Sequence, residues 1–417
     1  MPSSAAVRAT TAVMAVFLDF IVTARIHIGT AFVVPSIEEC LPFEKVVPGG
    51  LSVKAIVRNG VIGALLCAGM GTPEVGAQAG DQPFELVEVA QSDRQWTGVA
   101  VSKEGRIFVN YPRWWDEMPF SVAELDSLGD AHPFPDEKMN EWNPSMTAMD
   151  HFVCVQSVYV DNENFLWILD PANPGFQGVV EMGPKLMKVD LERNKVVMTI
   201  ILDSRIAPAN SYLNDVRVDT KKKHAYITES GTGAIVVINL ESGKPRRVLQ
   251  DHPSTKAEDI TLAIEGSPFE AKVHADGLTL DAKGKYLYYQ ALTGRTLYRI
   301  ETKWLRDESL SEAELGAKVE RVAESGASDG IAFGRDGHIY FTSLEHNAIR
   351  RLTPEGNVEV AVRDDRLRWP DSFAVAHDGT IHVTTAQIHL GPAAEDPYWL
   401  FKLVPRKSSS PDEREAP

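Results

Sequence analysis

The chain of 417 residues has little cysteine and lacks two motifs that mark large enzyme classes. Its three cysteines are too few for a disulfide framework. It contains no Gly-Lys-Ser/Thr phosphate loop and no His-Glu-x-x-His helix, which excludes the nucleotide hydrolases and zinc proteases that depend on them. With 44% hydrophobic and 24% charged residues, the composition is that of a globular protein rather than a disordered or polytopic membrane chain.

Basic side chains are also scarce, and the formal net charge is -16. Residues 1–80 carry equal numbers of acidic and basic side chains, so the whole excess lies on residues 81–417. An acidic body repels phosphate backbones, and we therefore expect no nucleic-acid partner. The partner we expect is a small-molecule ligand or substrate, bound by a monomer.

Residues 51–80 have the three-part layout of a secretory signal peptide. Lys54 and Arg58 give a basic start, Val61–Met70 is a short apolar run, and small residues precede a cleavage site near Ala79. The run is too short to anchor the chain across a bilayer, so no stable membrane span is expected. The layout predicts a secreted or periplasmic protein.

The remaining ends of the chain carry no fold pattern. We interpret residues 1–50 as a non-structural extension that results from a start codon assigned too early; the alternative is a membrane anchor at residues 12–35. The polar tail 406–417 is expected to be disordered. The folded body is then residues 81–405, and its single cysteine, Cys154, lies in an apolar run typical of a core.

The body repeats one pattern six times. Each unit has a polar residue, a small residue, an alternating apolar strand, a turn and a second strand, and the units recur at spacings of 42 to 62 residues. Turns such as Asp336-Gly337 and Asp378-Gly379 have hairpin chemistry. Four short strands per unit at this spacing predict an all-β fold, a six-bladed β-propeller. The first strands begin at Thr97, Gln156, Asn214, Asp276, Asp329 and Asp371.

The last unit has room for only three strands, the third being Trp399–Val404. The strand-like segment Phe84–Val89 is expected to supply the fourth, which closes the ring and removes an open edge. A row of β-sandwich domains is the alternative, which the regular spacing disfavours. Two segments depart from the pattern: the Pro- and Trp-rich residues 111–150, read as a functional loop or lid, and residues 303–319, which favour a short helix.

Several stretches are specific when taken together. They are Gly105–Trp114, His132–Pro135, Glu141–Asn143, Gln156–Asp161, Leu166–Asp170, Ala225–Gly231, Tyr286–Leu292, Asn347–Ile349 and Trp369–Ser372. With them, residues 84–404 resemble the major royal jelly protein and yellow family. The resemblance implies a secreted six-bladed propeller with either a dopachrome-isomerase-like activity or the binding of small amines in its central cavity. The family's usual cysteines are missing, which fits a bacterial branch.

In a propeller, the first strands line the axis and the second strands return to the same mouth. The six first residues therefore form one set at this mouth, within which Gln156, Asn214 and Asp371 are predicted to bind the ligand. A second set lies at the ends of the second strands, and Trp114, Trp115 and Trp142 either cover the cavity or pack beside it. The second set is Asn110, Asp170, Glu229, Gln290, Ser343 and Gln387.

The carboxylates at this mouth suggest two kinds of chemistry. The layout is similar to that of gluconolactonase-like propellers, which implies that Asn214, Asp276 and Asp329 hold one divalent cation, most simply Ca²⁺, in a metal-dependent lactonase. Asp276 and Asp329 are also the predicted catalytic residues, with His274 as a proton shuttle. A third possibility is a non-catalytic binder of aromatic or amine ligands. Asp-Gly is also a common turn, in which the carboxylate only bonds nearby backbone.

Overall fold

The structure is a computed structural model that describes residues 43–47, 51–58 and 61–66 by their backbone, and residues 82–115, 118–394 and 397–406. The chain divides into two compact units, residues 1–75 and 76–417. The first unit contains one antiparallel sheet in the order β1-β2-β3, made of β1 (Phe43–Val47), β2 (Leu51–Arg58) and β3 (Val61–Leu66). The cleavage site near Ala79 and residues 407–417 of the predicted tail lie outside the described residues, and the signal peptide stays a prediction.

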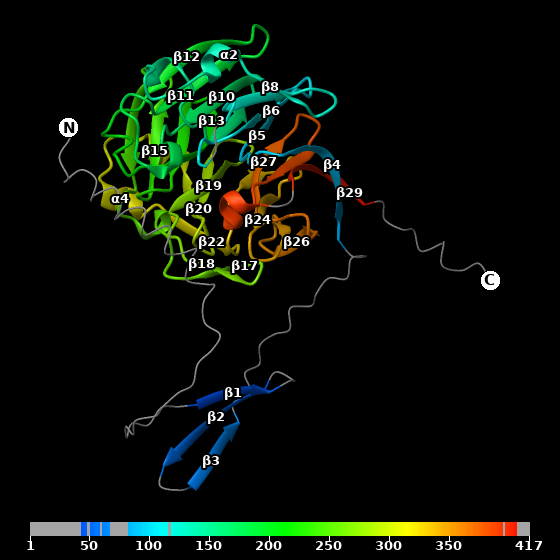
Figure 1. The fold of residues 1–417 in the computed structure, drawn as a ribbon. Coiled ribbons are helices and arrows are strands. Elements are labelled where there is room, and N and C mark those ends of the chain that lie inside the picture. The colour runs from blue at the N-terminus through cyan, green and yellow to red at the C-terminus, as the bar shows by residue number, and fades with distance from the viewer. Residues whose placement is uncertain are drawn as a thin grey trace, which may run out of the picture. The chain divides into compact units, whose positions relative to one another are not determined.

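The second unit contains six four-stranded sheets, which confirms the six-bladed β-propeller (Figure 1). Each sheet is antiparallel and, except for the last, is built from consecutive strands. Blade 1 is β5 (Val99–Val101), β6 (Ile107–Asn110), β7 (Val122–Leu125) and β8 (Ala131–Pro133). Blade 2 is β9 (Ser157–Val160), β10 (Phe165–Asp170), β11 (Lys185–Asp190) and β12 (Lys195–Ile201). Blade 3 is β13 (Leu213–Asp219), β14 (His224–Glu229), β15 (Ala234–Asn239) and β16 (Lys244–Val248).

The remaining blades follow the same order from axis to rim. Blade 4 is β19 (Ala275–Leu280), β20 (Tyr286–Ala291), β21 (Thr296–Glu301) and β22 (Glu320–Glu324). Blade 5 is β23 (Ile331–Phe333), β24 (Ile339–Ser343), β25 (Ala348–Leu352) and β26 (Val358–Arg363). Blade 6 is β27 (Pro370–Val375), β28 (Ile381–Thr385), β29 (Tyr398–Pro405) and β4 (Phe84–Ser92).

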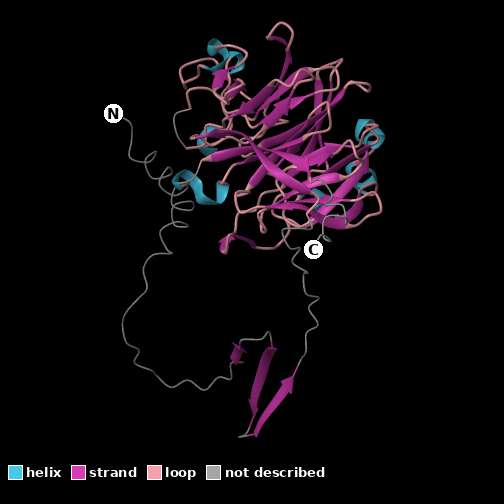
Figure 2. Cartoon of the chain, turned by 90° about the vertical axis from the view of Figure 1, so that its right-hand side faces the viewer, coloured by secondary structure: helices cyan, strands magenta, loops and turns pink. Residues whose placement is uncertain are grey.

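Short helices and one extra hairpin decorate the blades (Figure 2). No helix among the described residues is long and apolar enough to cross a membrane. The α-helices are α2 (Glu137–Asn140), α3 (Thr302–Arg306) and α4 (Glu312–Gly316). The 3-10 helices are η2 (Ala148–Asp150), η3 (Pro174–Phe176), η4 (Pro253–Thr255) and η5 (Ile388–Ala393), and the hairpin is β17 (Leu262–Ile264) with β18 (Ser267–Phe269).

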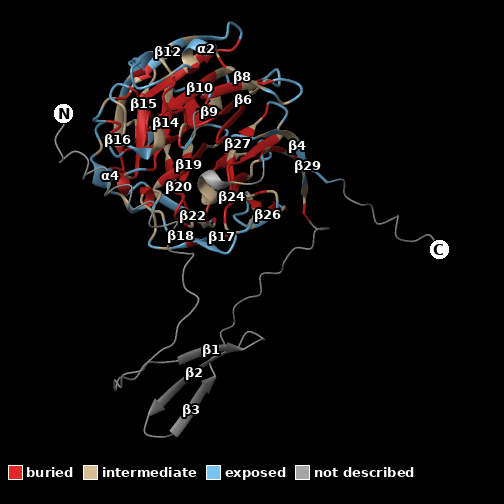
Figure 3. Cartoon of the chain, viewed as in Figure 1, coloured by how far each residue is buried: buried red, intermediate tan, exposed pale blue. Residues whose placement is uncertain are grey.

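Burial falls from the axis toward the rim (Figure 3). Every residue of β13 is buried, and every residue of β14 except the first is buried. The outermost strand of the same blade, β16, has a single buried residue. Apolar layers fill the space between neighbouring blades, as where Trp167 and Leu169 of blade 2 pack with Val216 and Ile227 of blade 3. The core is thus a ring of layers between sheets, and each blade is stabilised by both of its neighbours.

The predicted N-terminal strand completes the last blade. β4 pairs antiparallel with β29 along its length, from Phe84 opposite Pro405 to Ser92 opposite Tyr398 (Figure 1). The inner strand of the same blade, β27, lies beside β5 of blade 1, and the Thr384 hydroxyl donates to the Thr97 carbonyl across that boundary. The ends of the folded chain therefore meet in one sheet.

Two segments differ from the sequence predictions. Residues 111–150 are not only a loop, because β7 and β8 within them form the outer half of blade 1. These strands are too short to show an alternating pattern, and the Asn140 side chain holds the first by accepting from the backbone of Ser121 and Val122. Residues 303–319 form two short helices, since Ser311 and Glu314 build a capping box that starts α4 anew.

We expect β4 to be required for stability, whereas residues 1–80 are not required. A chain that begins at Asp81 should unfold like the full chain. A chain that begins at Asp93 exposes the edge of β29 and should lose several kcal/mol of unfolding free energy. Urea unfolding of both chains measures this. Equal unfolding of the two chains would show that β4 contributes nothing to closure.

Candidate functional site

The starts of the inner strands join in one hydrogen-bonded chain at one mouth of the channel. The Gln156 amide donates from Nε2 to Asn214 Oδ1 over 3.3 Å, and Asn214 Nδ2 donates to Asp276 Oδ2 over 2.7 Å. The carboxyl groups of Asp276 and Asp329 share a further hydrogen bond. Side chains from blades 2, 3, 4 and 5 therefore meet, although up to 173 residues separate them in the sequence.

Aromatic donors continue the chain at both ends. Trp369 Nε1 donates to Asp329 Oδ2 over 2.8 Å. At the other end, the Tyr212 hydroxyl donates to Gln156 Oε1 over 2.8 Å and accepts from Trp114 Nε1 over 2.6 Å. All five of these side chains are buried. The polar network is held in a dry environment, where hydrogen bonds and charges act strongly.

Asp276 does not belong to a turn, as the Asp-Gly alternative required. It lies inside β19, and only 1% of it is exposed. Gly277 follows it because a Cβ there would lie 2.1 Å from the Asp329 carbonyl oxygen of the neighbouring inner strand. Gly330 meets the Asp371 carbonyl in the same way, also at 2.1 Å. The glycines allow adjacent inner strands to approach closely, which brings their aspartates together.

Burial raises the pKa values of all three aspartates at this mouth. The pKa of Asp276 is raised well above its usual range by burial and then by the neighbouring Asp329 charge. Burial raises the pKa of Asp329 to about 6, although hydrogen bonds from Trp369 and Asp276 oppose the rise. The pKa of Asp371 is raised well above its usual value by burial and by the Asp329 charge. Such a cluster holds protons at neutral pH and shares them.

Asp371 also has an unused acceptor. Its Oδ1 accepts from the Ser372 hydroxyl over 2.7 Å, whereas its Oδ2 is buried without a hydrogen-bond partner among the described residues. A buried carboxyl oxygen without a hydrogen-bond partner is costly whether or not the group is protonated. A ligand N–H or O–H group at this mouth would satisfy it. Thr97 completes the predicted first set, and its hydroxyl donates to the Gln156 carbonyl over 3.0 Å.

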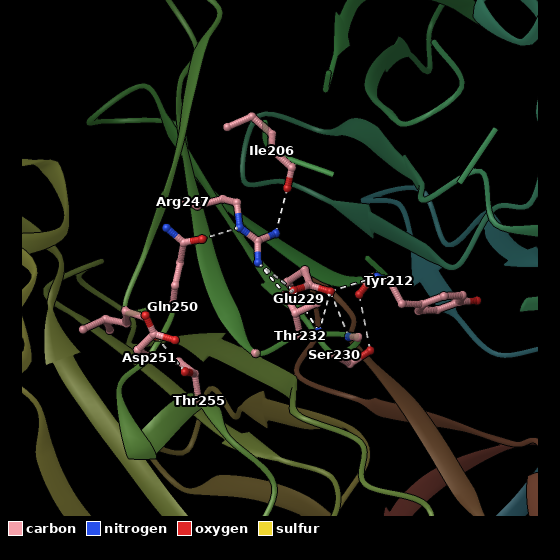
Figure 4. A network of polar contacts seen from close by, with 12 residues as sticks. Ile206, Tyr212, Glu229, Ser230, Thr232, Arg247, Gln250, Asp251 and Thr255 are labelled. Carbon is pink, nitrogen blue, oxygen red and sulfur yellow. Dashed lines mark hydrogen bonds and ion pairs between the residues drawn. The ribbon is translucent and has the colours of Figure 1, made fainter. Parts of the chain in front are cut away.

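The carboxylates of the second predicted set are paired with basic residues of their own blades. Asp170 accepts from Lys185 Nζ over 2.9 Å and from the Val153 backbone. Glu229 pairs with Arg247 over 2.8 Å and accepts from the Tyr212 backbone (Figure 4). Glu229 thus positions Tyr212, which is part of the polar chain.

Burial opposes ionisation of Glu229, but hydrogen bonds from Thr232, Tyr212 and Arg247 hold its pKa below the usual value. The carboxylate therefore stays charged in its pair with Arg247. This sets Glu229 apart from the three aspartates at the mouth, whose raised pKa values follow from burial without a basic partner of that kind.

The other members of the second set are also held by local contacts. Asn110 donates to Thr97 and accepts from the Gly98 backbone, and Gln290 contacts Ser325 and the Gly326 carbonyl. The Ser343 hydroxyl lies 3.2 Å from His346 Nδ1, and Gln387 donates to the Pro397 carbonyl. Their role in ligand binding stays a prediction.

His274 has a defined hydrogen bond of its own. Its Nδ1 accepts from the Ala257 backbone over 2.9 Å, and burial with the nearby Lys256 charge lowers its pKa. The described contacts include no hydrogen bond from His274 to Asp276. Its role as a proton shuttle stays a prediction.

An aromatic cluster adjoins the polar chain. Trp114 stacks on Phe176 with ring centroids 5.4 Å apart, and Phe176 lies 5.3 Å from Tyr212. Phe176 is 45% exposed and has a φ of 56°, a strained value for a bulky residue. Trp115 lies 6.0 Å from Phe176, and Trp142 packs against the apolar cluster that contains Trp114, Val153 and Tyr212. Exposed aromatic surface therefore adjoins the polar chain at its Tyr212 end.

The described arrangement does not fit a divalent cation. Among the described residues, no group of three or more His, Cys, Asp or Glu side chains is placed to hold a metal ion. Asn214 presents its amide N–H to Asp276, and its oxygen faces Gln156. A cation between these groups would meet a donor where it needs an oxygen ligand.

Sequence reasoning missed two features of this region. Asp215 is buried beside the chain with its pKa raised by burial, and it accepts from the Ser157 hydroxyl over 3.0 Å. The sequence feature that could have identified Asp215 is a carboxylate at the position where the other units have glycine or another small residue.

The second missed feature is Gly326-x-Ser328-x-Gly330, which matches a nucleophile elbow by pattern. It leads into a strand, and the Ser328 hydroxyl donates to the Gly330 carbonyl.

The raised pKa of Asp329 predicts that stability falls as pH rises. The folded chain binds this proton more tightly than the unfolded chain, whose carboxyl has its ordinary pKa of 3.8. The stabilisation is complete below that pH and is lost as pH rises through about 6, a difference of roughly 3 kcal/mol. Asp329→Asn should flatten this decline and raise stability at pH 8, measured by urea unfolding across pH. Glu181→Gln, at an exposed carboxylate, should leave the decline unchanged; an unaltered decline in Asp329→Asn would contradict the assignment.

Comparison with known proteins extends these observations. No curated protein matches the chain in sequence. Solved structures with related folds include a virginiamycin B lyase from Staphylococcus aureus in complex with quinupristin, at 15% identity and a TM-score of 0.45 over 77% of this chain and 100% of that one. A gluconolactonase from Xanthomonas campestris has 12% identity and a TM-score of 0.49 over 77% and 90%. A calcium-binding regucalcin from Agrobacterium tumefaciens has 15% identity and a TM-score of 0.49, over 78% of this chain and 95% of that one.

These similarities are too low to bear on activity. The family comparison is more informative, since the major royal jelly protein family matches residues 153–390, which is more than half of the chain. The match spans the inner strands that carry Gln156, Asn214, Asp276, Asp329 and Asp371. The resemblance seen in the sequence is confirmed, and the chain belongs to the major royal jelly protein family.

Proposed function

We propose that this protein is an isomerase that moves a proton within a small, quinone-like ring compound at the carboxyl-lined mouth of its channel. The observation that carries the proposal is the shared hydrogen bond between Asp276 and Asp329, in a buried cluster where the pKa of Asp329 is about 6. A carboxyl group that titrates near neutral pH is suited to general acid and base catalysis.

Tautomerisation needs one group that removes a proton from a ring carbon and another that delivers a proton elsewhere on the ring. Asp329 is the base, because the Trp369 N–H stabilises its ionised form. Asp276, with the higher pKa, is the acid that protonates a substrate oxygen. The proton gained by Asp329 then crosses the shared hydrogen bond and restores the pair. No oxidant or reductant is consumed.

The surroundings suit such a substrate. Phe176 and Trp114 offer aromatic faces at the Tyr212 end of the polar chain, and Asp371 Oδ2 can accept from an amine or hydroxyl of the ligand. Trp369, which donates to Asp329, has a φ of 53°. Its backbone is therefore strained, as is that of the exposed Phe176. Strain of this kind is concentrated at functional sites.

Turnover of dopachrome and related quinones, followed by absorbance, tests the proposal. Asp276→Asn and Asp329→Asn keep the side-chain shape but cannot exchange the proton, and we expect a loss of roughly 100-fold or more in kcat. Glu181→Gln is the matched control and should retain full activity. A chelator should have no effect on the rate, because no metal takes part in these steps.

A non-catalytic binder of aromatic amines is the second candidate, which the unpartnered Oδ2 of Asp371 favours. Wild-type protein that turns over no quinone but binds dopamine, and loses that binding in Asp371→Asn, would support this candidate instead. One tightly held Ca²⁺ in the purified protein, together with chelator-sensitive lactone hydrolysis, would favour the lactonase interpretation and contradict both.

We also propose that the protein acts outside the cytoplasm, because residues 51–80 have the layout of a signal peptide. Mass spectrometry of exported protein should then show an N-terminus between about residues 76 and 82. Recovery of residues 1–50 in the mature protein would contradict the signal-peptide interpretation.

A further inference from the structure

A cavity of about 280 Å³ lies at the opposite end of the channel from the carboxyl groups. All six inner strands line it, but they do so with their last residues and with the hairpin turns that follow. In blade 4, for example, Asp276 lies near the start of β19 at the first mouth, whereas Leu280 at the end of the strand and Lys283 in the turn after it border the cavity. The channel thus has a second mouth that the proposed reaction does not use.

Arg217 lines this cavity and carries its one buried guanidinium. The side chain is 10% exposed and lies over the Tyr159 ring, 5.2 Å from the centroid. Only two of its five N–H groups donate hydrogen bonds among the described residues, to the carbonyls of Val216 and Ile331. Asp215 is its ion-pair partner at 3.7 Å, a distance too long for a hydrogen bond, so the other N–H groups remain for a ligand.

The charge at this mouth is opposite to that of the protein. The cavity lining includes four basic and two acidic side chains, although the chain carries a net charge of -16. Both acidic residues are engaged by backbone: Asp219 accepts from Lys222, and Asp281 accepts from Lys285 and Tyr286. Lys221 and Lys283 are exposed at the entrance. An anion entering here is attracted by the entrance and then meets Arg217.

We propose that this cavity is a second binding site, which takes a small organic carboxylate with an apolar body. The guanidinium of Arg217 offers the planar donor pair that a carboxylate accepts. Val218, Leu280 and Phe333 supply apolar wall for the rest of the molecule. The cavity is just below the size of drug-ligand pockets, which start at roughly 300 Å³, so it suits a single ring or a short chain.

Benzoate is the probe, titrated into the full chain by calorimetry, with benzamide as its uncharged analogue. Benzoate should bind and benzamide should not. Arg217→Gln should weaken benzoate binding by about tenfold or more, and Arg217→Lys should weaken it less. Equal binding of the two probes, or unchanged benzoate affinity in folded Arg217→Gln, would overturn the proposal.

Two exposed substitutions keep the test decisive if the Arg217 variants do not fold. Ala282→Trp places a ring at the entrance and should abolish benzoate binding. Lys221→Gln with Lys283→Gln should weaken binding at low salt and have little effect at high salt, because exposed charges are screened. Benzoate binding that survives Ala282→Trp would place the site elsewhere, and tight binding of inorganic phosphate without benzoate would overturn the organic-acid assignment.

Asp329→Asn, at the other mouth, separates this site from the proposed isomerase. It should abolish quinone turnover and leave benzoate affinity unchanged, since its carboxyl group does not line the cavity. Failure of one proposal is therefore distinguishable from failure of the other. Loss of benzoate binding in Asp329→Asn would contradict a separate second site.

Discussion

The antiparallel pairing of β4 with β29 is the contact on which the ring depends. A propeller has no central core of its own; each blade is stabilised by apolar layers shared with its two neighbours. Blade 6 is built from both ends of the folded chain, so its sheet joins the start of the body to its end. Once the ring is closed, the six inner strands must line one axis, and their axis-facing side chains must share one channel.

That constraint gives the axis two ends of different chemistry. Asp276, Asp329 and Asp371 meet where the inner strands begin, and Arg217 lies near where they end. Asp215 lies between them, 3.7 Å from Arg217 and close enough to the other carboxyl groups to raise their pKa values. Protons held by the aspartates lower the cost of placing like charges together in a dry site.

Buried ion pairs behind the mouth hold the loops that carry its aromatic residues. Lys185 with Asp170 fixes the backbone of Val153, and Arg247 with Glu229 fixes the backbone of Tyr212 (Figure 4). Removing one partner of such a pair leaves an uncompensated buried charge, so these residues have little freedom to bind a ligand as well. They position the backbone of Val153 and Tyr212, whereas Asp276, Asp329 and Asp371 have no such basic partner among the described residues.

The sequence by itself determined the repeat, the number of blades and the strand that completes the ring, because each rests on local alternation and glycine turns. It also placed Asp276 and Asp329 at strand starts, since a residue's place along a strand is a local property. Only the tertiary structure decided which polar groups meet. Lys185 and Arg247 pair with Asp170 and Glu229, whereas among the described residues no basic side chain forms an ion pair with Asp276, Asp329 or Asp371. Arg217 and Asp215 looked like ordinary polar positions of one strand, and they acquire their roles because closure of the ring turns that strand toward the axis, where side chains far apart in sequence share one dry channel.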